Sequence, residues 1–378
     1  MSTSSRMQWL DTLRLIAGIS IVGLHSSSDF TGQPFPDYSE VQRIFPVLFR
    51  SVIYIARTEL FLIISLFLLC FAVDRRPRSY GVMIAEQTRR LLVPFTFWMV
   101  FFAFWRLIKA NYFGYEAAIW AELGQPMSWL GYFVLGDVQY HMHFLPTLFG
   151  LVLFAPLYNA AINRPALGLV ILVCLFVKHE VDVFLWAELS GLPGFDYLVR
   201  GVKIVTYLGY GFVAASCYGL YRQHLQNGER KQIAAVLLCL GGLLYLLKLV
   251  YSYKVITSGN WQHNFTPAYW ADFAMPAILF MAVMFWGRCI FPSVISKIAP
   301  FSFGLYLCHP MFLDLIEIVA YRYNFGPSEL VLAKFLGGLV LTSGLVFALS
   351  KIPLLAWTIG LGKIPVLERG RPLATAAK

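Results

Sequence analysis

Charged side chains are scarce in this chain of 378 residues. Asp, Glu, Lys and Arg together make up 13% of it, whereas hydrophobic residues make up 58% and the mean hydropathy is +0.66. A water-soluble protein of this length needs far more charge to cover its surface. The composition therefore excludes an ordinary soluble enzyme and indicates an integral membrane protein.

Motifs of several other protein classes are also absent. The six cysteines form no CxxC pair and lie within or beside apolar segments, so we expect neither a disulfide framework nor a metal site. No Gly-x-Ser-x-Gly motif of a serine hydrolase occurs. The net charge of +10 has no soluble basic domain to carry it, so we do not expect a nucleic-acid partner.

What the sequence does contain is a series of long apolar stretches. A transmembrane helix needs about 20 apolar residues to cross roughly 30 Å of hydrocarbon. The sequence predicts an all-α bundle of about ten such helices, at residues 9–29, 47–73, 90–109, 142–162, 165–185, 201–221, 232–251, 268–287, 299–320 and 330–351. We therefore expect residues 1–351 to form one transmembrane domain in contact with membrane lipids, and residues 352–378 to form a basic cytoplasmic tail.

Basic residues are unevenly distributed among the connections. Lysine and arginine gather in alternate connections, notably 75–90, 222–231 and the C-terminal segment, and the intervening connections hold most of the acids. Cytoplasmic loops of membrane proteins carry an excess of Lys and Arg. The alternation predicts an even number of helices with both termini in the cytoplasm.

Two ionisable residues lie within the first predicted span. Arg14 and His25 are eleven positions apart, which on a helix amounts to about 1100°, roughly 20° more than three turns. Their side chains are therefore expected on one face, roughly 16 Å apart along the axis. Ionisable residues at membrane depth are energetically expensive and commonly mark functional sites.

Each of these two residues has a functional and a structural interpretation. The imidazole of His25 can take a proton from a hydroxyl group near neutral pH, as acyl transfer to an alcohol requires, or it can pack against a backbone carbonyl. The guanidinium of Arg14 can hold a phosphate or carboxylate through two hydrogen bonds, or it can extend to lipid headgroups beside Asp11. Their shared intramembrane face favours the functional interpretation.

Five fragments, in order along almost the whole chain, resemble segments of a known family. They are WLDTLRLIAGISIVGLH (9–25), ELFLIISLFLL (59–69), RRLLVPFTFW (89–98), HFLPTLFGLVLFAPLY (143–158) and FSFGLYLCHP (301–310). The family is membrane acyltransferase family 3, whose signature is a basic residue, ten arbitrary residues and then histidine, as in Arg14 and His25. Leu66 departs from the usual glycine, and His143 stands where tryptophan is common.

The resemblance implies both an activity and a set of site residues. The family transfers acyl groups from a cytoplasmic coenzyme A thioester to glycans at or beyond the outer face of the membrane, which here implies a multi-pass protein of the bacterial inner membrane. It implies His25 as the catalytic base and Arg14 as its partner or as a contact for the donor. The resemblance also places Glu59, Arg89, Arg90, Tyr306 and His309 at positions that line the site.

Three other histidines have open interpretations. His141 and His143 lie at the edge of the span predicted at 142–162, where contacts to an acceptor sugar are slightly favoured over a structural role. Two positions spaced i and i+2 point to different faces of a helix, which argues against a metal pair. His309 precedes Pro310 in the span predicted at 299–320 and fits a structural role as well as a functional one.

Other charged residues in or beside the spans also admit two readings. Arg89 and Arg90 are most simply anchors on the cytoplasmic side, with binding of coenzyme A phosphates as the alternative. Asp272 needs a partner inside the bundle, and Lys248 is positioned in sequence to supply it. A succinyl group would need a cation for its free carboxylate, which Arg57 or Lys254 could provide.

These observations together predict a membrane O-acyltransferase. We expect acetyl-CoA, or less readily succinyl-CoA, as the donor, and a sugar hydroxyl of an exopolysaccharide, another cell-surface glycan or a lipid-linked oligosaccharide as the acceptor. Two alternatives come from other classes. One is a transporter or flippase for a lipid-linked or acylated glycan, although no inverted repeat is evident. The other is a haem protein that uses His25 and His309 as ligands.

Overall fold

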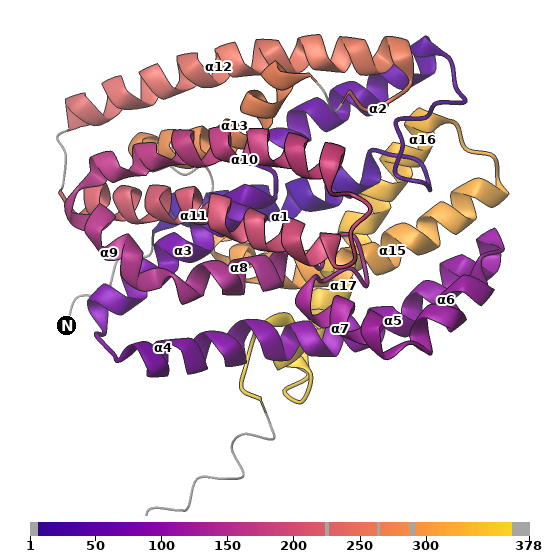
Figure 1. Cartoon of the computed structure of the whole chain (residues 1–378), viewed down its shortest axis with the longest axis horizontal. Helices are drawn as coiled ribbons and strands as arrows, with labels where there is room; N and C mark the ends of the chain where they lie inside the picture. Colours follow the sequence, from indigo (N-terminus) through magenta and orange to yellow (C-terminus); the bar gives the residue numbers. More distant parts are fainter. Residues whose placement is uncertain (1–6, 224–226, 263–264, 288–291, 365–378) are drawn as a thin grey trace, which may run out of the picture.

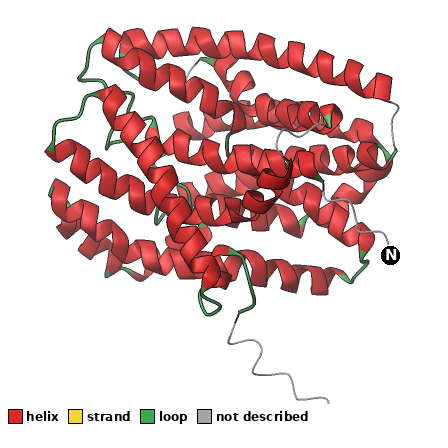
Figure 2. Cartoon of the chain, turned by 180° about the vertical axis from the view of Figure 1, so that it is seen from behind, coloured by secondary structure: helices red, strands yellow, loops and turns green. Residues whose placement is uncertain are grey.

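The part of the chain that the computed structural model describes is helical throughout and contains no strand. It comprises residues 7–223, 227–262, 265–287 and 292–364. Cys289 and the basic residues of the two extreme ends therefore lie outside the described residues. Most helices run along the long axis of the molecule, with α12 along one edge, α4 and α5 along the opposite edge and α1 between them (Figure 1). The view from behind shows the same layering of helices joined by short loops (Figure 2).

The helices of the first half of the chain comprise three long ones, α1, α3 and α5, and six shorter ones. They are α1 (Gln8–Ser26), α2 (Glu40–Ile53), α3 (Thr58–Arg75), α4 (Tyr80–Gln87), α5 (Val93–Phe113), α6 (Glu116–Leu123), α7 (Pro126–Val134), α8 (Phe144–Leu153) and α9 (Ala155–Asn163). Two short turns join neighbouring helices here, η1 (Tyr54–Ala56) and the π-turn η2 (Thr88–Leu92).

The second half contains the two longest helices of the described residues, α11 and α12. Its helices are α10 (Val170–Glu188), α11 (Phe195–Arg222), α12 (Asn227–Ser258), α13 (Thr266–Trp286), α14 (Pro292–Ile298), α15 (Ser302–Arg322), α16 (Pro327–Leu332) and α17 (Gly338–Lys351). Short turns again connect them, namely η3 (Pro165–Leu169), η4 (Ala299–Phe301), η5 (Ala333–Gly337) and η6 (Ala356–Ile359).

Proline and glycine set several of the helix ends. Pro126 and Pro327 occupy the first position of α7 and α16, where the missing N–H leaves no hydrogen bond unmade. Gly114 and Gly287 follow α5 and α13 with φ of 82° and 64°, a left-handed conformation that side chains with a Cβ rarely adopt. These residues fix where the chain leaves one helix and turns into the next.

Every predicted span coincides with helical structure, but fewer helices are both long and apolar enough to cross a membrane. Among the described residues there are 7 such helical segments, or up to 8 if the pair α8 and α9, bent by 68°, is one broken span. Helices α1 and α10 are each 19 residues long, about 28 Å, but carry ionisable side chains along their length. The protein is thus a multi-pass helical membrane protein, and ten spans stays a prediction.

Three predicted boundaries need correction. The first helix ends at Ser26 rather than at residue 29, because the hydroxyls of Ser26 and Ser27 bind the carbonyls of Val22 and Leu24, both at 2.7 Å. The span predicted at 47–73 is divided between α2 and α3 by η1. The segment between the spans predicted at 90–109 and 142–162 is not only a connection, because it contains the short helices α6 and α7.

Close packing of α1 against its neighbours holds the centre of the bundle together. A Cβ added at Gly18 would lie 3.3 Å from Cβ of Ser302, and one at Gly23 would lie 3.0 Å from the side chain of Ile53. Small residues allow helix backbones to approach closely in membranes, where van der Waals contact replaces the hydrophobic effect as the driving force. The backbone of α1 is therefore fixed against α15 on one side and α2 on another.

Ion pairs inside the bundle follow the rule that buried charges need partners. The ammonium of Lys248 on α12 binds the carboxylate of Asp272 on α13, which confirms the predicted pair. Arg14 lies 3.6 Å from Asp11, one turn earlier on α1. The outward faces are apolar, and α12 in particular exposes valines, leucines and Tyr253 to its surroundings, as expected for a helix in contact with lipid.

The segment after α17 does not begin as a free tail. The indole of Trp98 on α5 donates a hydrogen bond of 2.8 Å to the carbonyl of Thr358 in η6. Gly360, with φ of 74°, lies directly against the ring of Phe303 on α15. The described part of the predicted tail, residues 352–364, is therefore packed on the transmembrane domain, and the remaining residues lie outside the described part.

The orientation of the bundle can be tested directly. Because lysine and arginine gather in alternate connections, a reporter fused after Lys378 should be active only if it reads out from the cytoplasm. A paired fusion in the acidic connection after Gly191 should respond only to a reporter that reads out from the opposite side of the membrane. An external C-terminus would mean either that the number of spans is odd or that the whole bundle is inverted.

Candidate active site

A cavity of about 200 Å³ lies at the middle of the bundle, and we call it the central chamber. Its wall combines ionisable side chains with aromatic and aliphatic ones from α1, α2, α3, α8 and α11. The lining residues are Ile21, Leu24, His25, Arg50, Tyr54, Arg57, Thr58, Glu59, Leu62, His141, His143, Phe144, Thr147, Lys203, Tyr207 and Tyr306. Five residues predicted for the site, His25, Glu59, His141, His143 and Tyr306, are thus brought together here.

His25 occupies the last turn of α1, where the helix ends and the wall of the chamber begins. Its ring packs against Tyr140, with centroids 4.3 Å apart, and stacks on His309 at 5.4 Å with the planes inclined by 22°. Among the described residues its ring nitrogens have no hydrogen-bond partner, and its side chain faces both the central chamber and a second cavity. His25 can therefore interact with a molecule that enters from either side.

His309 is held in one tautomer by the proline that follows it. Pro310 has no N–H, so the carbonyl of Tyr306 four residues earlier is left without its helical partner. Nδ1 of His309 lies 2.8 Å from that carbonyl oxygen and 3.1 Å from that of Leu305, so Nδ1 must carry the proton. Its Nε2 is then an acceptor, and it has no partner among the described residues.

His143 is oriented in a similar way on the other wall. Its Nδ1 lies 2.9 Å from the carbonyl oxygen of Tyr140, which again places the proton on Nδ1 and leaves Nε2 as an acceptor. His143 immediately precedes α8, whereas the span predicted at 142–162 would have placed it within a helix. Loop geometry, not helical spacing, therefore decides where His141 and His143 point.

His141 is buried near the rings of His309 and His143, and its side chain is only 2% exposed. Its ring centroid is 5.1 Å from that of His309, and its backbone carbonyl accepts a hydrogen bond of 2.7 Å from the hydroxyl of Tyr306. Burial lowers the pKa of His141, and the neighbouring imidazoles of His309 and His143 lower it further. This histidine is therefore neutral at physiological pH, and contact between its ring and an acceptor sugar in the chamber stays a prediction.

Glu59 is tied to its surroundings by two strong contacts. Its Oε2 lies 2.7 Å from Nε of Arg57, and its Oε1 accepts a hydrogen bond of 2.6 Å from the hydroxyl of Tyr207. The guanidinium of Arg57 also lies over the rings of Tyr54 and Phe273, at 4.7 and 4.2 Å from their centroids. Glu59 therefore acts as a buried counter-ion that positions Arg57 at the chamber wall.

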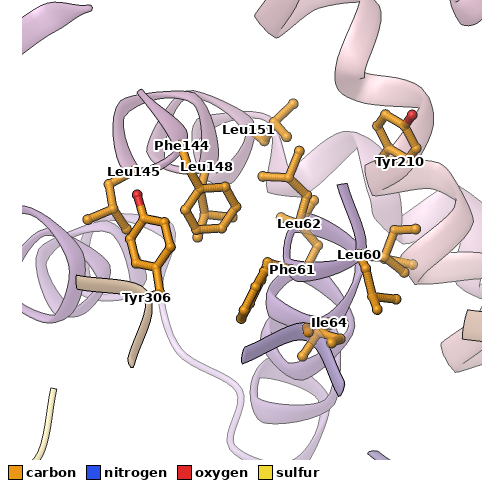
Figure 3. Close-up of a cluster of buried hydrophobic side chains, with 14 of the residues drawn as sticks. Leu60, Phe61, Leu62, Ile64, Phe144, Leu145, Leu148, Leu151, Tyr210 and Tyr306 are labelled. Atoms are coloured by element: carbon orange, nitrogen blue, oxygen red, sulfur yellow. The ribbon is translucent and has the colours of Figure 1, made fainter. Parts of the chain in front are cut away.

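An aromatic wall separates the central chamber from a second cavity. Phe144 lies 5.2 Å from Tyr306 and 6.0 Å from Phe61, measured between ring centroids. Figure 3 shows these three rings between the leucines of α3 and α8. Phe144 and Tyr306 line both cavities and therefore form the partition between them.

The cavity beyond this wall has a volume of about 320 Å³ and contains the second residue of the predicted pair. We call it the Arg14 cavity, because Arg14 and Arg90 supply its charge. Arg90 and Gly360 also line a shallower groove at the surface, the Arg89 groove, with Arg89 and Lys363. Arg14 and His25 thus do not share one chamber, and instead they face two cavities on opposite sides of the aromatic wall.

A third cavity, of about 310 Å³, adjoins the central chamber on its other side. We call it the Lys334 cavity, and it shares Leu24, His25 and Arg50 with the chamber. The carboxylate of Glu317 binds the ammonium of Lys334 at 2.8 Å and that of Lys109 on the opposite side. Glu317 therefore serves these two lysines rather than His309, although it follows His309 on the same helix.

Together the three cavities form a series that runs from the Arg14 side of the bundle to the Lys334 side, with His25 at the second junction. Sequence reasoning missed several residues of this path, notably Arg50, Tyr140 and Lys203. Lys203 could have been found, because it is an ionisable residue inside the span predicted at 201–221. Arg50 gave the same signal inside the span predicted at 47–73, whereas Tyr140 gave none, since it enters the path only through contacts between distant segments.

The same geometry argues against the haem alternative. Two axial histidines must bind the iron from opposite faces of a porphyrin, with the macrocycle lying between the two rings. The rings of His25 and His309 instead stack on one another at 5.4 Å, which leaves no room for a macrocycle.

Comparison with known families gives one match. A family model described as an acyltransferase domain, that of acyltransferase family 3, matches residues 7–351. No curated protein and no solved structure matches the chain. The matched range covers all the helices from α1 to α17 and every residue that lines the central chamber.

Proposed function

The chain belongs to acyltransferase family 3, and from this membership and the three cavities we propose that it is a glycan O-acyltransferase. The donor is an acyl-CoA, and the acceptor is a sugar hydroxyl of an exopolysaccharide, another surface glycan or a lipid-linked oligosaccharide. The reaction takes place in the bacterial inner membrane. The observation that carries the proposal is that His25 lies where the central chamber meets the Lys334 cavity.

In the proposed reaction His25 acts as the general base. An acceptor hydroxyl in the chamber donates its proton to His25 as its oxygen attacks the thioester carbonyl carbon. The carbon–sulfur bond then breaks, the ester remains on the sugar, and the coenzyme A thiolate recovers the proton from His25. A thioester needs no covalent enzyme intermediate, so direct transfer is sufficient.

Charge on the tetrahedral intermediate needs a donor within the chamber. Arg57 and Lys203 line it, and Arg57 is held in place by Glu59 at 2.7 Å. Fixed cations in a site with little water stabilise a developing oxyanion more than they would in solution. We therefore propose Arg57 as the residue that stabilises the oxyanion, with Tyr207 and Glu59 as positioning residues.

The donor is proposed to enter through the Arg89 groove and the Arg14 cavity. Arg89 and Arg90 would bind the phosphates of coenzyme A, and the pantetheine arm would lie along the Arg14 cavity. The thioester would then reach the aromatic wall of Phe61, Phe144 and Tyr306. Displacement of Tyr306 from the carbonyl of His141 would open the wall toward His25.

Arg90→Ala is expected to raise the KM for acyl-CoA by about 10–100-fold, because a hydrogen bond to a charged phosphate contributes about 1.5–3 kcal/mol. The KM for the same acyl group on pantetheine, which lacks the nucleotide, should rise much less. Initial rates of thiol release measure both. Arg322→Ala is the matched control, because Arg322 lies at the last residue of α15, whereas the first residue, Ser302, lines the Arg14 cavity. Equal increases in KM with both donors would refute phosphate binding at Arg90.

A transporter or flippase remains the runner-up, because a series of cavities across a bundle would also serve transport of a lipid-linked glycan. The two functions differ in their product. Purified protein in lipid nanodiscs, given acyl-CoA and an acceptor glycan, should release free coenzyme A and increase the mass of the acceptor by one acyl group. Movement of glycan with no thiol release would favour the transporter.

A further inference from the structure

The central chamber carries more positive than negative charge. Arg50, Arg57 and Lys203 line it, and Glu59 is the only carboxylate among its lining residues in the described part of the chain. Glu59 already neutralises Arg57, at 2.7 Å from its Nε. Two cations of the chamber, Arg50 and Lys203, are therefore left without a carboxylate.

Lys203 is an exception among the inward-facing lysines of the described residues. The other four each bind at least one carboxylate, in the pairs Lys109 with Asp314 and Glu317, Lys178 with Asp182, Lys248 with Asp272, and Lys334 with Glu317. The ammonium of Lys203 lies 5.3 Å from the ring centroid of Tyr207 and makes no hydrogen bond or ion pair within the described part. The fold thus compensates every interior lysine except the one that faces the chamber.

Arg50 shows the same lack of a counter-ion on the opposite wall. Its Nη1 donates to the carbonyl of Leu24 and to the hydroxyl of Ser27, both at 3.1 Å. Its guanidinium lies 4.5 Å from the ring centroid of Trp261. These contacts satisfy part of the five-donor fork, and no carboxylate of the described residues binds the rest.

A cation that faces a cavity inside the membrane loses much of its hydration and gains stability from an arriving anion. We infer that the central chamber receives a substrate that carries a carboxylate, with Lys203 as its principal counter-ion and Arg50 as a second. The inference rests on the proposed function, because the chamber is where acyl group and acceptor would meet. The carboxylate can come from a dicarboxylic acyl chain such as succinyl, or from an acidic sugar of the acceptor.

The position of each cation bears on these two sources. Lys203 lines the central chamber but not the Lys334 cavity, whereas Arg50 lines both and so also faces the acceptor side. We therefore expect a free carboxylate at the end of a short acyl chain to bind Lys203 rather than Arg50. Neither cation predicted from the sequence fits as well, since Glu59 neutralises Arg57, and Lys254 is exposed on α12 outside the chamber.

The experiment compares charged and neutral substrates in the full-length protein in nanodiscs. Acetyl-CoA and succinyl-CoA are each paired with methyl glucoside and methyl glucuronide, and kcat/KM is measured from coenzyme A release. We expect the wild type to prefer one carboxylate-bearing partner at least tenfold over its neutral counterpart. A preference for succinyl-CoA assigns the carboxylate to the acyl chain, and a preference for the glucuronide assigns it to the sugar.

Substitution then tests the residue itself. Lys203→Met should reduce that preference about tenfold, Lys203→Arg should keep most of it, and Lys254→Met should leave it unchanged. If the methionine variant does not give monodisperse protein, Lys203→Gln takes its place. No preference in the wild type, or an equal loss of rate with all four substrate pairs in the Lys203 variants, would overturn the inference.

A second measurement separates this inference from the proposed function. If no substrate pair releases coenzyme A, the proposed reaction fails, but binding of an anion can still be measured. Succinate or glucuronate should then raise the thermal midpoint of the wild type, glucose should not, and the rise should disappear in Lys203→Met. Absence of any rise in the wild type would overturn the anion site independently of catalysis.

Discussion

Replacement of His25 by alanine is expected to lower the rate of acyl transfer by about 10²–10⁴-fold, the usual effect of losing a general base. The protein should still fold, because the ring nitrogens of His25 have no hydrogen-bond partner among the described residues that the substitution would leave unpaired. The turnover number, from coenzyme A release at saturating substrate, measures the loss. Gel-filtration profiles in detergent verify folding.

Glutamine at the same position distinguishes a base from a structural histidine. An amide restores hydrogen bonding but cannot accept a proton near neutral pH. His25→Gln should therefore be as inactive as His25→Ala. The wild-type rate should rise with pH through the titration of a histidine, and that limb should be missing from the residual activity of both variants. His179→Ala is the matched control, because His179 packs on Tyr269 of α13, away from the chamber.

A different outcome would transfer the role to another ring. If His25→Gln keeps most of the wild-type rate, His25 is not the base. His309 and His143 are then the next residues to test, since each has its proton fixed on Nδ1 and an acceptor Nε2. The two differ in position, because only His143 lines the central chamber directly.

Glu59→Ala is expected to lower the free energy of unfolding by about 3–5 kcal/mol, the cost of removing one partner from a buried ion pair. The side chains of Glu59 and Arg57 are only 3% and 14% exposed, and the substitution leaves the guanidinium of Arg57 and the hydroxyl of Tyr207 without their acceptor. The midpoint of thermal unfolding in nanodiscs, together with denaturant titration in detergent, measures the loss.

A double substitution tests whether the uncompensated charge is the cause. Arg57→Ala combined with Glu59→Ala should be more stable than Glu59→Ala alone, because no unpaired buried cation remains at that pair. Asp37→Ala, in an exposed connection, serves as the control and should leave stability unchanged. If Glu59→Ala unfolds at the wild-type midpoint, the pair is hydrated and Glu59 does not position Arg57.

Helical periodicity was sufficient to relate Arg14 to His25, but not to assign them to one pocket. The spacing of eleven residues placed both side chains on the same face of α1, and both do face cavities. Between them stand the rings of Phe144 and Tyr306, which come from segments more than 100 residues further along the chain. A period along one helix carries no information about what another helix inserts beside it.

The histidines illustrate the same difference at closer range. The pair His309–Pro310 was visible in the sequence, and the missing N–H of proline explains why Nδ1 of His309 has a free carbonyl to bind. The stacking of that ring on His25 required α1 and α15 to pack closely, which they do through Gly18 and Ser302. His141 and His143 were assigned to a helix edge, and the turn before α8 brings both of them to the central chamber.

The sequence by itself determined the class of the protein, its helices and its family. These depend on local features, namely apolar runs of membrane length, proline and glycine at helix ends, and motifs of consecutive residues. The tertiary structure alone decided that Lys203 is left without a carboxylate within the part of the chain that the structure describes. Lys248 and Lys203 look alike in sequence, each an interior lysine within an apolar span, yet Lys248 meets Asp272 and Lys203 meets a cavity. The physical reason is that electrostatic interactions inside a bundle depend on distances between helices, and those distances follow from packing rather than from order along the chain.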